Sequence, residues 1–132
     1  MEGDAATLVR DYIEAWNRRD LAAMESLLDS GAEWERSAEF PEGRVLKGRG
    51  PIVDFARSMF DTFTETPIEV EECTEGSGGR VLVVGSTSFT GGQSGARTEA
   101  QWVRVYTVRD GRIADIRPYP DRASGLEAIS AA

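Results

Sequence analysis

Two strand-like runs joined by an Asp-Gly pair, near the end of the chain, restrict the fold more than any other feature. Residues 102–108 and 112–119 are rich in Val, Ile and Tyr, and Asp110 and Gly111 lie between them. An Asp-Gly pair readily adopts the positive φ angles of a tight hairpin turn, so the two runs are predicted to pair as antiparallel strands. The hairpin indicates a fold class, but it does not indicate a reaction.

Apolar side chains recur at helical spacing in the first half of the chain and predict three helices. The first helix follows Asp4 as its N-cap, and the second is capped by Asp20 and ends near Gly31. The third has a wide apolar face and includes Pro51 in its first turn, where proline is well tolerated. A short fourth helix is predicted at the end of the chain, where Ser124 begins a capping-box pattern.

Strand-like segments make up most of the second half of the chain. Strands are predicted at residues 33–40, 45–47, 68–74, 80–90, 98–108 and 112–119. Helices followed by a run of antiparallel strands predict an α+β fold, with the helices packed on one face of a curved sheet. No repeat, linker or low-complexity segment interrupts the pattern, so residues 1–132 are predicted to form one domain.

The charge and the rare residues exclude several classes of function. A formal net charge of -8 repels phosphate backbones and anionic lipid, so neither nucleic acid nor a membrane is expected as a partner. The chain has no histidine, which excludes mechanisms that need imidazole, and its one cysteine, Cys73, can form no intramolecular disulfide. No metal or other cofactor is expected. No apolar run is long enough for a membrane span, and the acidic N-terminus is unlike a signal peptide, so a cytoplasmic protein is expected.

The order of the predicted elements, with the sequences of residues 12–21 and 108–113, resembles the NTF2-like superfamily. Within that superfamily the chain is most similar to the SnoaL-like group. The resemblance covers nearly the whole chain and implies a cone-shaped fold that encloses a pocket. Relatives with this fold include polyketide cyclases, ketosteroid isomerase, epoxide hydrolases, dehydratases and non-catalytic binding domains, so the fold by itself does not identify a reaction.

Ketosteroid isomerase gives the clearest comparison of site residues. Laid on this sequence without a gap, its catalytic tyrosine falls on Tyr12, which retains the hydrogen-bond donor. Its aspartate base falls on Arg36 and its oxyanion-hole aspartate on Val103, so both acids are lost and that isomerase mechanism is not expected. The epoxide hydrolase triad is also incomplete, because its late aspartate falls on Pro118. Glu99 is the nearest replacement for the acidic residue that the polyketide cyclases use.

Strand alternation extends this comparison to the predicted wall of the pocket. If Val103 faces inward, then Glu99 and Gln101 also face inward. Trp102, Arg104 and Tyr106 are then on the outer face, where they predict a homodimer interface. The remaining predicted substrate-binding residues are mainly apolar or aromatic: Trp16, Trp34, Arg36, Phe40, Phe55, Met59 and Ile116.

Two functions remain open from the sequence. In the first, a small apolar or aromatic metabolite binds in the pocket and is cyclised, isomerised or dehydrated, with Glu99 moving the proton while Tyr12 and Gln101 polarise a carbonyl and Arg36 holds an oxyanion. In the second, the chain is a non-catalytic binding or dimerisation module. Tyr12 is then a core aromatic, and Arg36 and Glu99 form a structural ion pair.

Overall fold

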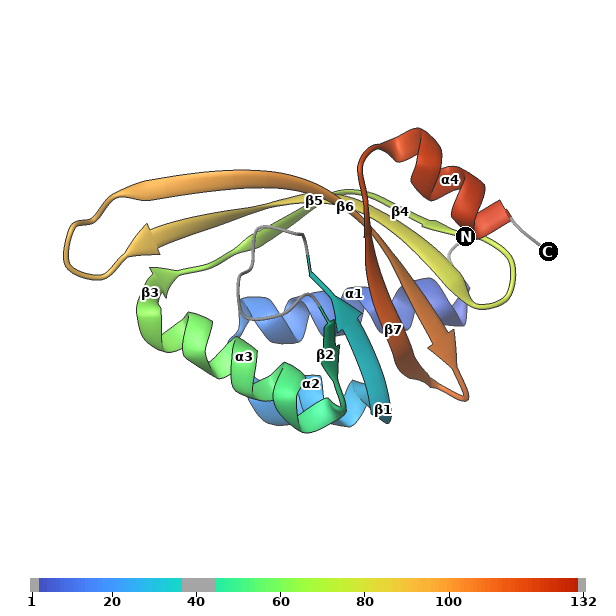
Figure 1. The fold of residues 1–132 in the computed structure, drawn as a ribbon, viewed down its shortest axis with the longest axis horizontal. Helices are drawn as coiled ribbons and strands as arrows, with labels where there is room; N and C mark the ends of the chain where they lie inside the picture. Colours follow the sequence, from blue (N-terminus) through green and yellow to red (C-terminus); the bar gives the residue numbers. More distant parts are fainter. Residues whose placement is uncertain (1–2, 37–44, 131–132) are drawn as a thin grey trace.

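A computed structural model describes residues 3–36 and 45–130, and these contain four helices and seven strands (Figure 1). The helices are α1 (Asp4–Asn17), α2 (Leu21–Leu27), α3 (Arg49–Thr62) and α4 (Arg122–Ser130). The strands are β1 (Leu28–Glu35), β2 (Val45–Lys47), β3 (Phe63–Glu65), β4 (Ile68–Glu75), β5 (Arg80–Gly91), β6 (Arg97–Arg109) and β7 (Arg112–Tyr119). The predicted α+β class is confirmed.

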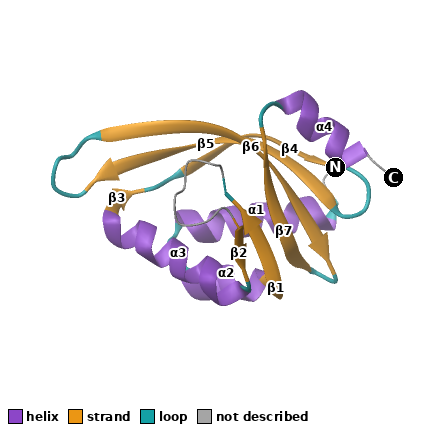
Figure 2. Ribbon diagram, in the orientation of Figure 1, coloured by secondary structure: helices purple, strands orange, loops and turns teal. Residues whose placement is uncertain are grey.

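All seven strands belong to one open, curved sheet. Its order is β2-β1-β7-β6-β5-β3, and β4 also pairs with β5. The β1–β7 pair is parallel and the other pairs are antiparallel, so the sheet is mixed where an antiparallel one was predicted. Helices α1, α2 and α3 cover one face, here called the inner face, whereas α4 lies on the opposite, outer face (Figure 2). The far ends of β5 and β6 extend beyond the other strands.

The hairpin predicted around Asp110 and Gly111 joins β6 to β7. Both turn residues have positive φ, 54° and 75°, and Arg109 pairs with Arg112 across the turn. Asp-Gly is favoured here because aspartate tolerates the left-handed region and glycine has no Cβ to oppose it. The turn sets the register of β6 against β7, and this register positions the β6 and β7 residues of the candidate site.

Several predicted boundaries are wrong by a few residues. Helix α1 begins at Asp4 itself, with Gly3 as its N-cap. Helix α3 begins at Arg49, which leaves Pro51 in its first turn as predicted. Helix α2 ends at Leu27, because Leu28 already belongs to β1 and is fully buried in the core. The cap of α4 is Asp121, whose carboxylate accepts a hydrogen bond from the Ser124 backbone N–H at 2.8 Å.

Two further differences concern strands. The apolar spacing that predicts the third helix extends to Phe63, but Phe63 begins the short strand β3 and pairs with Gly91 of β5. The strand predicted over residues 33–40 ends at Glu35, and residues 37–40 lie outside the described part of the chain.

The core has two parts, one on each face of the sheet. The larger part packs α1, α2 and α3 against the inner face, and Tyr106 is one of its largest fully buried side chains. The smaller part lies under α4 on the outer face and contains Leu82, Val105 and Ile129. Strands β5 and β6 are therefore buried on both faces where these two parts overlap. Within the described residues, no helix is long and apolar enough to span a membrane.

Candidate functional site

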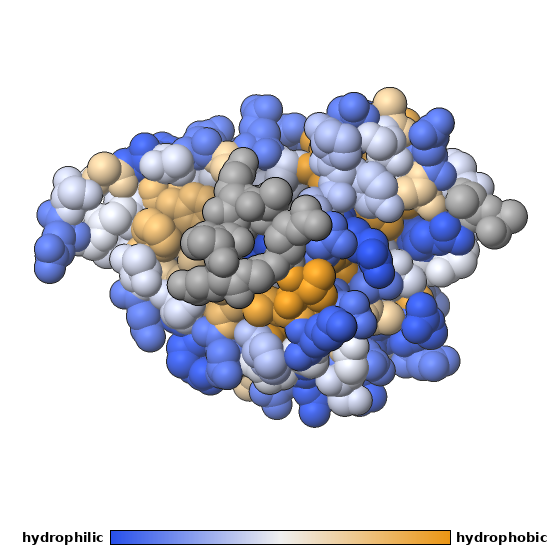
Figure 3. Space-filling view, viewed as in Figure 1, coloured by the Kyte–Doolittle hydropathy of each residue, from blue (hydrophilic) through white to orange (hydrophobic). Residues whose placement is uncertain are grey.

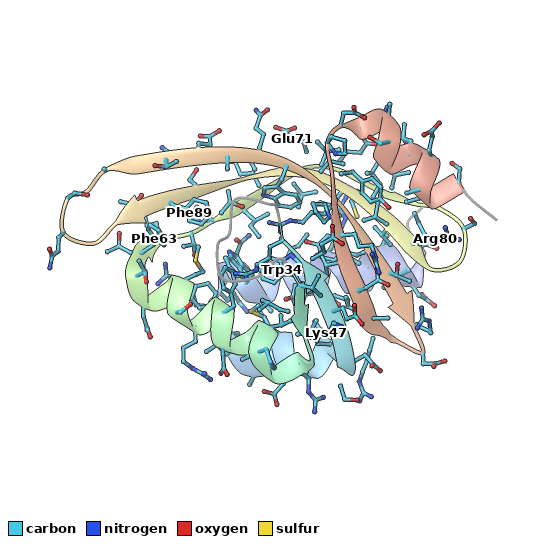
Figure 4. The ribbon with its side chains drawn as sticks, in the orientation of Figure 1. Trp34, Lys47, Phe63, Glu71, Arg80 and Phe89 are labelled. Atoms are coloured by element: carbon cyan, nitrogen blue, oxygen red, sulfur yellow. The ribbon has the colours of Figure 1, made fainter. Side chains whose placement is uncertain are left out.

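A cavity of about 690 Å³ opens between the inner face of the sheet and helices α1 and α3. Figure 4 shows Trp34, one of its wall residues, between the sheet and the helices. The wall is largely aromatic, with Tyr12, Trp16, Trp34, Phe55, Phe89, Trp102 and Tyr106. All three tryptophans of the chain are among these residues. In the space-filling view, apolar surface gathers below the β5–β6 arm and beside the grey segment (Figure 3).

Helical periodicity brings two of the predicted wall residues together. Tyr12 and Trp16 are four residues apart on α1, so their side chains share one helix face. Trp34 is near the end of β1 and Arg36 directly follows the strand, and both border the cavity. The predicted residues that border the cavity from the helices, β1 and β7 are Tyr12, Trp16, Trp34, Arg36, Phe55, Met59 and Ile116. Phe40 lies outside the described residues.

The predicted orientation of β6 is reversed in the structure. Tyr106 is 1% exposed in the inner core and Trp102 packs against the same cluster, whereas Val103 and Val105 pack on the outer side under α4. Trp102, Arg104 and Tyr106 therefore face the cavity, and the prediction that they form an outer dimer interface is wrong. Alignment of Val103 with an inward aspartate of ketosteroid isomerase caused the error. The alternation of bulky aromatics along β6 was the signal that could have corrected it, because large apolar side chains gain most from burial.

The same reversal moves Glu99 away from the cavity. The Glu99 side chain is 54% exposed, and its Oε2 lies 3.7 Å from Nη2 of Arg97. The predicted ion pair between Glu99 and Arg36 therefore does not form. Gln101 and Val103 still border the cavity, although their alternation along β6 places their side chains on the outer face. The last residues of β6 and β7 that pair are Val103 and Tyr119, so the edge of β6 before Val103 has no partner strand on that side. The cavity reaches this free edge, and it is therefore bordered by residues from both faces of β6.

Two tyrosine side chains face each other across the inner wall. The ring centroids of Tyr12 and Tyr106 lie 6.4 Å apart in an edge-on arrangement. Burial raises the pKa of the Tyr12 hydroxyl far above its ordinary value, Tyr106 raises it further, and the positive charge of Arg104 partly opposes both effects. Tyr12 is therefore neutral at physiological pH and keeps its proton. Its hydroxyl makes no hydrogen bond within the described residues, so it can donate one to a molecule in the cavity.

Two arginines bring positive charge to the cavity. The Arg104 guanidinium carbon lies 3.9 Å from the centroid of the Trp102 ring and 5.5 Å from that of Trp34. Arg36 is 5% exposed, and its guanidinium carbon lies 4.7 Å above the Phe55 ring. Within the described wall, the one carboxylate belongs to Glu71, an exposed residue that Figure 4 shows above the sheet and away from Trp34.

Hydrogen bonds orient two of the three cavity tryptophans. The indole N–H of Trp16 donates to the Thr66 carbonyl oxygen at 2.7 Å, and that of Trp102 donates to the Thr87 hydroxyl at 2.8 Å. Fixing both indoles presents ring faces to the cavity without unpaired N–H groups. Among the residues that the structure describes, no three Cys, Asp or Glu side chains lie close enough together to hold a metal ion.

Comparison with known proteins supports the resemblance to the SnoaL-like group. A family model described as the SnoaL-like domain matches residues 9–116. No sequence among curated proteins matches the chain. Solved structures of other proteins match over nearly the full length of this chain.

An NTF2-like protein of unknown function from Burkholderia pseudomallei is 22% identical, with 98% of this chain and 100% of that chain covered and a TM-score of 0.77. A putative polyketide cyclase from Pseudomonas putida is 16% identical, with 96% and 98% covered and a TM-score of 0.71. TerC, crystallised with polyporic acid, is 18% identical, with 96% and 98% covered and a TM-score of 0.76. At these identities the likeness shows the fold alone, which is NTF2-like, as predicted.

Proposed function

The chain belongs to the SnoaL-like domain family, and we propose that it binds a small, largely apolar or aromatic molecule in the cavity between α1, α3 and the sheet. The observation that carries this proposal is the aromatic wall, to which every tryptophan of the chain contributes. Ligand sites are usually concave, mainly apolar and provided with a few polar groups that fix orientation, and Tyr12 and Arg104 are such groups here. The crystallisation of TerC with polyporic acid is consistent with an aromatic ligand in this fold.

The geometry favours binding over the acid/base chemistry considered from the sequence. A general base must lie within hydrogen-bond reach of the proton that it removes. Glu99 is exposed outside the cavity, Glu71 lies on the outer side, and the described inner wall supplies no other carboxylate. Tyr12 holds its proton and can donate a hydrogen bond, but it is not ionised to accept a proton. We therefore place ligand binding, without proton transfer by Glu99, as the function that the site supports best.

A matched pair of phenylalanines on α3 tests the location of the site. Phe55 borders the cavity and packs edge-on against Trp34, with ring centroids 5.2 Å apart. Phe60 packs edge-on against Trp16 at 4.8 Å but does not border the cavity. Phe55→Ala is expected to weaken the binding of an aromatic ligand by about 10-fold or more, because it removes a wall contact. Phe60→Ala is expected to leave the affinity within about threefold, since its ring supports the core instead.

Tryptophan fluorescence and thermal shift supply the measurements. A panel of aromatic polyketides, steroids, terpenoid epoxides and fatty acids is titrated into the wild type, and a ligand that enters the cavity changes the emission of its three tryptophans. Binding should also raise the melting temperature in proportion to ligand saturation. The proposal fails if the panel produces neither signal, or if the two alanine variants weaken the best ligand equally.

A homodimer through the outer sheet face is also proposed, on a different set of residues from the predicted one. Val84 and Val103 are half-buried on that face, and Gln101 beside them is exposed. Apolar side chains at the rim of a packed cluster are suited to a modest interface. Sedimentation equilibrium is expected to give twice the 14.4 kDa chain mass at micromolar concentration, and a sedimenting monomer would contradict the proposal.

A further inference from the structure

Arg104 is the polar group of the cavity whose surroundings most restrict the chemical class of a ligand. Its guanidinium carbon lies 3.9 Å from the Trp102 ring centroid and 5.5 Å from that of Trp34. Within the described residues it makes cation–π contacts only, with no ion pair or hydrogen bond. A guanidinium carries five N–H donors, and two ring faces satisfy none of them. The donors of Arg104 are therefore available to an acceptor that enters the cavity.

We propose that the molecule bound in this cavity is an anion, namely an aromatic carboxylate or an acidic enol whose negative oxygen pairs with Arg104. This inference rests on the proposed function, because it assigns the chemical class of the ligand at the same site. A planar guanidinium recognises a carboxylate through two parallel hydrogen bonds, which fixes orientation as well as charge. The indole rings that hold Arg104 also offer flat apolar surface to the aromatic part of such a ligand.

The distribution of charge around the cavity supports an anion over a cation. Arg104 borders the cavity without an acidic partner among the described residues, while the one carboxylate of the described wall, that of Glu71, is exposed on the outer side of the sheet. The face of the Trp102 ring, where a ligand cation would otherwise bind, is already occupied by the guanidinium of Arg104. A second cation there would meet like charge at short range. An arginine without an acidic partner among the described residues is also unexpected in a chain with a net charge of -8, so general composition does not account for it.

Tyr12 supplies a second hydrogen-bond donor to the same cavity. Its buried hydroxyl keeps its proton and interacts electrostatically with Arg104, and both residues border the cavity. One neutral O–H and one permanent cation thus border a cavity whose wall is rich in aromatic and apolar side chains. Such hydrogen bonds are stronger in a low-dielectric site than in water, so the pair should distinguish an anion from a neutral ligand of the same shape.

Three ligands of nearly the same shape test the inference at pH 7. They are 2-naphthoate, which is an anion, 2-naphthamide, which is neutral, and 2-naphthylmethylamine, which is a cation. Dissociation constants are measured by tryptophan quenching and by calorimetry. The wild type is expected to bind naphthoate about 10-fold to 100-fold more tightly than naphthamide, and the amine most weakly. Arg104→Met should remove the preference for naphthoate, and Arg104→Lys should retain part of it because the charge remains.

A matched control is available on the same strand. Arg97 belongs to β6 but its side chain is 67% exposed and lies beside Glu99 on the outer face, so Arg97→Met should leave the preference unchanged. Equal binding of naphthoate and naphthamide to the wild type overturns the anion inference but leaves the proposed function intact. A preference that persists in Arg104→Met also overturns the inference. If none of the three ligands binds at millimolar concentration while the wider panel contains a ligand, the anion inference is overturned and the proposed function stands. If the panel contains no ligand either, both fail.

Discussion

Replacement of Tyr106 by alanine is expected to lower the free energy of unfolding by about 3–5 kcal/mol. The side chain is 1% exposed and is among the largest fully buried ones. Its backbone pairs with Val81 of β5 on one side and Ile116 of β7 on the other, so the strand cannot shift easily to fill the space. Loss of the ring would remove buried apolar area and leave a void beside Tyr12.

Two companion variants show whether the ring itself causes the loss. Tyr106→Phe should change stability by less than about 1 kcal/mol, because the hydroxyl makes no hydrogen bond with a described residue. Gln101→Ala, at an exposed position on the other face of the same strand, should stay within about 0.5 kcal/mol of the wild type. Urea unfolding followed by far-ultraviolet circular dichroism measures all three. If Tyr106→Ala lowers the free energy of unfolding by less than about 1 kcal/mol, the ring of Tyr106 is not buried in the core.

Replacement of Gly79 by alanine is expected to cost about 3 kcal/mol or more. Gly79 lies in the turn between β4 and β5 with φ +74°, a conformation in which a Cβ atom is strained. An added Cβ would also lie 2.2 Å from the carbonyl oxygen of Val108, a backbone atom that cannot rotate away. The Gly79 carbonyl meanwhile accepts a hydrogen bond from the Val108 N–H at 2.8 Å, so relief of the clash would break the link between this turn and β6.

Gly111 provides a control with almost the same backbone conformation. Its φ is +75°, but no heavy atom lies within 4 Å of the position that its Cβ would occupy. Gly111→Ala should therefore cost only the conformational strain, about 1–2 kcal/mol. Thermal and urea unfolding of both variants separate strain from clash. Equal losses in the two would mean that the turn at Gly79 moves away from Val108 at little cost, contrary to this expectation.

Local sequence signals account for much of the fold. Asp110 and Gly111 adopt the positive φ angles that their chemistry favours, and the strands on either side pair as predicted. The apolar spacing of α1 also places Tyr12 and Trp16 on one buried face. These features depend on turn chemistry and side-chain periodicity, which act over a few residues and can be read from the chain directly.

Boundaries and strand pairing depended on contacts between distant segments. Leu28 was predicted in a helix, but burial of its side chain beside Ile113 of β7 draws it into β1. The parallel β1–β7 pair joins segments about 80 residues apart, and no local pattern marks it. The same tertiary register decided that β6 turns Arg104 inward and Glu99 outward.

The sequence by itself determined the fold class, the aromatic face of α1 and the alternation of β6 into two sets of side chains. Alternation separates the sets but does not say which one is buried, because both faces of β6 are partly covered, one by α1 and the other by α4. Only the tertiary structure decided between them, since burial of Tyr106 and Trp102 in the inner core outweighs burial of the smaller Val103 and Val105 there. That choice placed a guanidinium in the cavity in place of the expected carboxylate.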